Sequence, residues 1–137
     1  MICLDTNVIS ELVRPLPDPK VLVWIQAQPR SELCTAAVVE AEIRIGLSAL
    51  PEGARRRRLA LQYDQLVFGI LPVFPFDDLA AKHCADIVEQ RRRLGRPMMF
   101  ADAQIAAVCV ARDLRLATRN RADFTDCGIT LIDPFGG

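Results

Sequence analysis

Short, mostly apolar runs alternate with longer amphipathic segments along this chain. The runs end at or near polar residues, which is typical of strands buried on both faces of a sheet. Five of them predict strands: Ile2–Leu4, Leu33–Ala36, Ile70–Phe74, Arg115–Thr118 and Ile129–Ile132. Helical segments separate most of these strands, so the pattern favours crossover connections over tight hairpins.

Proline, glycine and capping residues set the boundaries of the predicted helices. The proline-rich stretch Pro15–Pro19 ends the first helix, because proline cannot continue one. Asp77 or Asp78 caps a long helix that stops at Gly95. The other predicted helices cover Asn7–Val13, Val21–Gln28, Val38–Leu50, Pro51–Gly69 and Met98–Leu114.

Alternating strands and helices predict a single three-layer α/β/α domain over residues 1–137, with a five-stranded, mainly parallel sheet. The 137 residues, 51% hydrophobic and 25% charged, have the composition of an ordinary globular domain. Such sheets bind their ligands outside the carboxyl ends of the strands, near a topological switch point. The residues that directly follow each strand are therefore the first candidates for a site.

The charge and cysteine content limits the classes of partner and metal. No uncharged apolar run is long enough to span a membrane, and the first residues lack a basic segment, so we expect a cytoplasmic protein. Only two of the 17 basic residues are lysine. This arginine bias suits nucleic acid or an acidic protein, although a GC-rich genome produces the same bias. A single histidine and five scattered cysteines make a zinc site improbable.

Two carboxylates stand where an apolar side chain is expected, and a third follows the first strand. Glu42 lies among Val38, Val39, Ile45 and Gly46, which we predict to face the sheet. Asp5 has two interpretations, because it caps the next helix or belongs to a site.

Asp102 repeats the pattern seen for Glu42, since its helical neighbours Ile105, Ala106 and Cys109 form an apolar stripe. A buried carboxylate without a counter-charge is costly. A divalent cation bound by Asp5, Glu42 and Asp102 would explain all three, and oxygen ligands favour Mg²⁺ or Mn²⁺.

Polar residues also follow the fourth strand. Asn120 or Asp123 could complete the pocket, although Asp123 is equally explained as a turn residue. Arg119 and Arg121 flank Asn120 and are candidates for contacts with phosphate. The runs Arg55–Arg58 and Arg91–Arg93 point around their helices, so we interpret them as solvated faces, contacts for an acidic partner, or contacts for an RNA backbone.

Four segments together resemble the PIN-domain ribonucleases, and in particular the VapC and FitB type toxins of bacterial toxin–antitoxin pairs. They are LDTN after the first strand, VVEAEIRIGL, FADAQIAA and LATRNRADF. The resemblance implies an α/β/α domain whose acidic pocket binds Mg²⁺ or Mn²⁺ and hydrolyses RNA internally through a metal-activated water. It also implies a homodimer and a cognate antitoxin protein.

The same resemblance assigns roles to individual residues. Asp5, Glu42 and Asp102 fall on the family's acidic core, and Thr6 falls on its polar neighbour. Asn120 falls on a fourth catalytic position that is often aspartate.

Three alternatives remain open from the sequence. A catalytically weak PIN fold that acts as an interaction module is compatible with Asn120. A phosphohydrolase with Asp5 as nucleophile would need a second aspartate at Asn7 and a lysine after a later strand, and the chain has neither. A receiver-like signalling domain would also need a lysine late in the chain.

Overall fold

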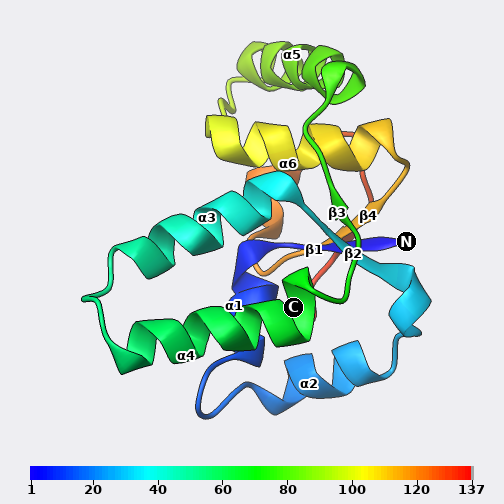
Figure 1. Ribbon diagram of the computed structural model, residues 1–137. Coiled ribbons are helices and arrows are strands. Elements are labelled where there is room, and N and C mark those ends of the chain that lie inside the picture. Colours follow the sequence, from blue (N-terminus) through cyan, green and yellow to red (C-terminus); the bar gives the residue numbers. More distant parts are fainter. Residues whose placement is uncertain (137) are drawn as a thin grey trace.

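The computed structural model describes residues 1–136, and its five strands form one parallel sheet in the order β3-β2-β1-β4-β5 (Figure 1). The strands are β1 (Ile2–Leu4), β2 (Leu33–Ala36), β3 (Val73–Phe74), β4 (Arg115–Ala117) and β5 (Leu131–Ile132). From β1 the chain first builds outward through β2 and β3, and then returns to place β4 on the other side of β1. The topological switch point therefore lies between β1 and β4. The predicted fold class is confirmed.

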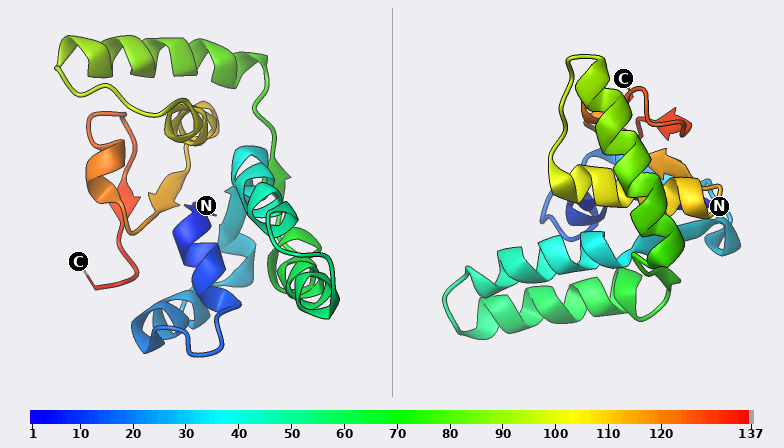
Figure 2. Two further views of the ribbon diagram at one scale, coloured as in Figure 1. Left: turned by 90° about the vertical axis from the view of Figure 1, so that its left-hand side faces the viewer. Right: turned by 90° about the horizontal axis from the view of Figure 1, so that it is seen from above.

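Helices cover both faces of this sheet. They are α1 (Thr6–Leu12), α2 (Pro19–Gln26), α3 (Ala37–Ser48), α4 (Ala54–Tyr63), α5 (Asp78–Arg93) and α6 (Phe100–Ala111). Short turns are η1 (Arg30–Glu32), η2 (Asp64–Phe68) and η3 (Arg121–Phe124). Figures 1 and 2 show α5 packed on α6 at one face, α1 and α2 at the other, and the α3–α4 hairpin extending past the sheet. No helix in the described chain is both long and apolar enough to cross a membrane.

Three predicted elements begin later than the sequence pattern suggested. The helix expected from Pro51 starts at Ala54, because Gly53 has a φ of 155° and forms the turn before it. The helix expected from Met98 starts at Phe100, since Met99 is extended.

The third strand is also shorter than predicted, with only Val73 and Phe74 instead of Ile70–Phe74. Pro72 precedes it and has no N–H to donate, although its carbonyl accepts a 3.0 Å hydrogen bond from the amide of Thr35. The fourth and fifth strands each lose one or two residues at an end. These differences do not change the topology.

Small side chains let α6 lie directly against the sheet. Ala103 and every residue from Ile105 to Cys109 are buried, so nearly the whole helix surface is in the core. All five cysteines are free and buried, as expected of small apolar residues. The first turn of α6 is consequently fixed in place beside the switch point.

Candidate active site

Asp5 follows β1 directly and performs both of the roles that its position suggested. Its Oδ1 accepts a 2.8 Å hydrogen bond from the amide of Thr6, which caps α1. Its Oδ2 accepts a 2.7 Å hydrogen bond from the hydroxyl of Thr118 and a 3.4 Å bond from the side chain of Asn7. The residue is only 4% exposed. The carboxylate is thus held rigidly at the carboxyl end of the central strand.

Thr118 is a site residue that sequence reasoning missed. It is fully buried, and its Oγ1 also accepts a 3.1 Å hydrogen bond from the amide of Asn120. In the parallel register of β1 and β4, Leu4 is opposite Ala117, so the next residue on each strand meets the other at the strand ends. That register becomes visible only once β4 is known to be the neighbour of β1.

Glu42 lies at the border of the core and not within it, so the predicted stripe around it was wrong. Ile45 is 68% exposed, and the side of α3 that faces the core carries Val39, Ile43 and Leu47. Because α3 extends past the sheet, only this narrow face is covered. Glu42 is partly buried, and its Oε1 accepts a 3.3 Å hydrogen bond from the hydroxyl of Thr6, the residue after Asp5.

Asp102 and Asp123 lie across from Asp5, at a small hollow beside the start of α6. Asp102 is in the first turn of α6 and partly buried, with Ile105, Ala106 and Cys109 buried behind it as predicted. Asp123 comes from η3, the turn that follows β4. The hollow is lined by Arg91, Pro97, Met98, Met99, Asp102 and Asp123. Within the described residues no side chain or amide donates a hydrogen bond to the Asp102 carboxylate.

Electrostatic repulsion links these carboxylates. Burial is the largest cause of the raised pKa of Asp5, Glu42 and Asp102. Neighbouring negative charge adds to it, and Asp5, Asp123 and Glu42 all help to raise the pKa of Asp102 to about 6. Hydrogen bonds from Thr118, Thr6 and Asn7 act in the opposite direction on the pKa of Asp5. The site therefore holds more negative charge than its surroundings neutralise.

Arg91 is the one basic residue lining this hollow, and it is 4% exposed. Its guanidinium donates to three backbone carbonyls, of Arg96 at 2.7 Å, Asp123 at 3.0 Å and Thr125 at 2.8 Å. It thereby ties α5 to the turn that carries Asp123. The sequence placed Arg91 in a solvated run, and only its two successors, which pair with Glu89, fit that interpretation.

The remaining candidates from the sequence lie farther out. Asn120 is exposed, and the hydrogen bond it makes to the site comes from its backbone amide. The guanidinium of Arg119 stacks over the ring of Phe135 at 4.3 Å, while its amide donates to Asn7. Arg121 is exposed at the start of η3. Arg55 and Arg58 line a separate hollow with Arg14, between the end of α1 and α4.

The donor set suits a hard divalent cation in its chemistry. All four clustered side chains are carboxylates, and their raised pKa values record charge that a cation would neutralise. Within residues 1–136, however, no three histidine, cysteine, aspartate or glutamate side chains are grouped closely enough to hold a metal ion as they stand. The carboxylates surround the site without forming a finished coordination shell.

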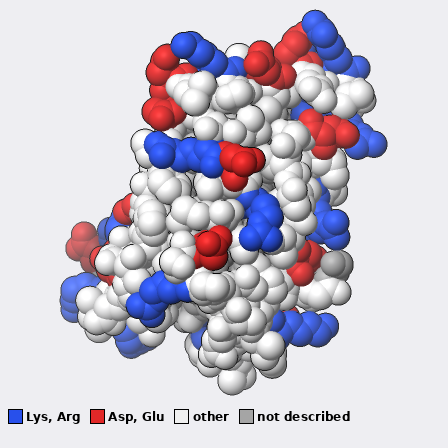
Figure 3. All heavy atoms as spheres, turned by 90° about the vertical axis from the view of Figure 1, so that its right-hand side faces the viewer, with Lys and Arg blue, Asp and Glu red and all other residues white. Residues whose placement is uncertain are grey.

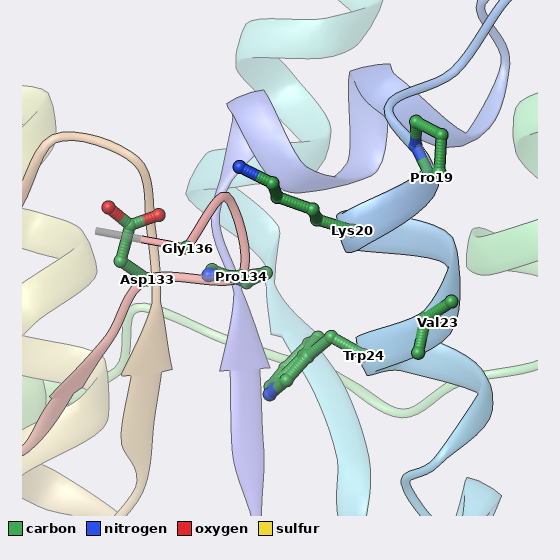
Figure 4. A pocket seen from close by; sticks show the side chains of 7 residues that line it. All are labelled: Pro19, Lys20, Val23, Trp24, Asp133, Pro134 and Gly136. Carbon is green, nitrogen blue, oxygen red and sulfur yellow. The ribbon is translucent and has the colours of Figure 1, made fainter.

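Other surfaces of the molecule show no comparable concentration of acidic groups. A hollow between α2 and the C-terminal segment is lined by Pro19, Lys20, Val23, Trp24, Asp133, Pro134 and Gly136 (Figure 4). Its walls are mainly apolar, with Trp24 directed toward Pro134. On the face at the amino ends of the strands, acidic and basic side chains are interspersed (Figure 3).

This fold, with its acidic residues at the switch point, defines the class of protein. The PIN domain family matches residues 2–128, and the chain belongs to that family. Within it, the chain is similar to a VapC ribonuclease (Y4jK) of Sinorhizobium fredii (strain NBRC 101917 / NGR234), with 41% identity over 140 residues and 98% of each chain covered. It is 33% identical to toxin FitB of Neisseria gonorrhoeae over 98% of this chain and 99% of that protein.

Solved structures agree with this assignment. FitAcB from Neisseria gonorrhoeae superposes with a TM-score of 0.93 at 30% identity, over 100% of both chains. DNA-bound VapBC from Salmonella typhimurium gives a TM-score of 0.78 at 25% identity over 97% of each chain. The structural neighbours are thus toxin–antitoxin complexes of the VapBC and FitAB type.

Proposed function

We propose that this protein is an Mg²⁺- or Mn²⁺-dependent endoribonuclease and the toxin of a toxin–antitoxin pair. The observation that carries the proposal is the electrostatic coupling of Asp5, Glu42 and Asp102, with Asp123 beside them, at the switch point of a PIN domain. The similarity to a VapC ribonuclease over nearly the whole chain supports RNA as the substrate.

Asp5, Glu42 and Asp102 would hold the cation. When bound, a divalent cation lowers the pKa of coordinated water and offsets the charge that develops on phosphate during hydrolysis. The protein's own part is to present oxygen ligands in a fixed direction. The amide of Thr6 and the hydroxyl of Thr118 orient the two oxygens of Asp5, and the hydroxyl of Thr6 orients Glu42.

Asp123 supplies a carboxylate on the turn where Asn120 lacks one. Its negative charge reaches both Asp5 and Asp102. Asn120 was the reason to consider an idle interaction module, and this nearby carboxylate favours the nuclease instead. Arg91 holds the backbone of Asp123 in place from the protein interior.

We infer RNA, a cognate antitoxin and a second copy of the chain as partners. The antitoxin proposal follows from the similarity to FitAB and VapBC complexes, which are toxin–antitoxin assemblies. A protein that cleaves RNA requires such an inhibitor while it is stored in the cell.

The test compares two glutamates on the same helix. Glu42 faces the site, whereas Glu40 pairs on the surface with Arg44 at 2.6 Å. In Mg²⁺, Glu42→Gln should slow RNA cleavage by about 100-fold or more, while Glu40→Gln should stay within about twofold of the unmodified protein. Equal rates for the two variants would contradict the proposed role of Glu42.

A further inference from the structure

Phe100, at the first position of α6, is 66% exposed and is the most exposed aromatic side chain in the described chain. The single Trp, the single Tyr and the five other Phe residues are all buried or partly buried. Met99, directly before it, is 74% exposed. Large apolar side chains left in water in a contiguous pair mark a surface that another molecule covers.

These two side chains border the carboxylate cluster. Met99 lines the same hollow as Asp102 and Asp123, and Phe100 is two residues ahead of Asp102 on one helix. The carboxyl ends of β1 and β4 and the start of α6 all lie at the same side of the molecule, at the left of Figure 1 and facing the viewer in the left view of Figure 2. A molecule that reaches Asp102 therefore passes over Met99 and Phe100.

The helix fixes this surface before anything binds. The amide of Ala103 donates to the carbonyl of Met99 at 3.0 Å, and Ala103 itself is buried. Since the backbone under both side chains is already ordered, covering them costs little conformational entropy.

Charge at the site favours a nucleobase as the molecule that covers them. The clustered carboxylates repel a phosphate backbone, and the nearest arginine, Arg91, is buried with its guanidinium bonded to three carbonyls. Affinity close to the cleaved bond must then come from contacts that need no cation. An aromatic face provides one, because every base has a π-face that stacks on it.

We propose that Phe100, flanked by Met99, is a stacking platform for an unpaired base next to the cleaved phosphodiester. The proposal rests on the proposed ribonuclease function and narrows its substrate to single-stranded or looped RNA, since bases in a duplex already stack on one another. Phe100 binds substrate here and takes no part in the chemistry.

Steady-state cleavage of a short unpaired RNA in Mg²⁺ tests this platform. Loss of one base–aromatic stack should raise the KM of Phe100→Ala about tenfold with little change in kcat. Phe100→Leu should lose nearly as much, and Phe100→Trp should restore the KM, because only an aromatic ring stacks. Val23→Ala is the matched control, because Val23 is 68% exposed on α2 and should leave KM unchanged.

Two results would overturn the platform while leaving the ribonuclease function in place. One is an unchanged KM for Phe100→Ala, and the other is full activity of Phe100→Leu. A change in oligomeric mass of Phe100→Ala by light scattering would also overturn it, because a second copy of the chain would then be the molecule covering Phe100. If the unmodified protein cleaved no RNA in Mg²⁺, the proposed function itself would fail.

Discussion

The hydroxyl of Thr118 donates a 2.7 Å hydrogen bond to Oδ2 of Asp5 and so joins the carboxyl end of β4 to that of β1. Both residues are buried, and they come from opposite ends of the chain. This bond crosses the topological switch point and favours the ionised form of Asp5. The acidic site thus depends on the strand order of the sheet as well as on its carboxylates.

Thr118→Val should destabilise the protein at neutral pH. Valine has a similar shape but cannot donate, and a hydrogen bond to a charged group contributes about 1.5–3 kcal/mol. The pKa of Asp5 should rise further, because the Thr118 bond lowers it. The deficit in unfolding free energy should therefore shrink as acid protonates Asp5. Urea unfolding at several pH values measures this, with Thr118→Ser as the variant that keeps the donor. Equal stability of Thr118→Val and the unmodified protein at pH 7 would show that the bond contributes nothing.

Arg91→Met should be among the most destabilising single changes in α5. Three carbonyls would lose their donor, and unsatisfied buried polar groups cost about 1–3 kcal/mol each before water enters. We expect a melting temperature lower by roughly 10 °C, given about 2–4 °C per kcal/mol for a domain of this size. Arg92→Met is the control, because Arg92 is exposed and pairs only with Glu89. The account is wrong about Arg91 if both variants melt together.

Asp102→Asn should stabilise the metal-free protein at neutral pH. The pKa of Asp102 is raised to about 6 from 3.8, so the folded state binds its proton more tightly than the unfolded state does. Folding stability from this group is therefore full below about pH 4 and is lost as the pH rises through 6. In EDTA at pH 7.5, the variant should melt a few degrees higher than the unmodified protein, because about 1 kcal/mol shifts the melting temperature by 2–4 °C.

At pH 4 in EDTA the two proteins should melt alike, because Asp102 is then protonated in both states. A variant that melts lower at both pH values would instead indicate that Asp102 serves as a structural carboxylate in the first turn of α6.

The apolar runs and helical periodicity predicted the sheet and its crossovers, because strands buried on both faces leave a strong signal. Asp5 and Asp102 also stood out, since each is a carboxylate placed against an apolar stripe or a strand end. The sequence could not predict the surroundings of Glu42. Periodicity shows which side chains share a face of α3, but not how far α3 extends past the sheet.

Thr118 and Arg91 show two further limits. The role of Thr118 depends on β4 lying beside β1, a long-range pairing that local pattern does not contain. Arg91 did have a local signal, because it continues the buried stripe of Ala80, Cys84 and Ile87 at helical spacing. Its place in a run of three arginines concealed that stripe. The late start of α6 depends on the extended backbone at Met99, which follows Pro97.

The central claim is that RNA cleavage needs a divalent cation held by Asp5, Glu42 and Asp102. The most direct measurement is cleavage of a labelled RNA by metal-free protein, with Mg²⁺ added back stepwise and Mg²⁺ binding followed by calorimetry in parallel. We predict no cleavage in EDTA, recovery that follows occupancy of the calorimetric site, and loss of both the binding heat and the cleavage in Asp102→Asn. Undiminished cleavage in EDTA, or cleavage restored in Asp102→Asn at the same Mg²⁺ concentration, would contradict the account.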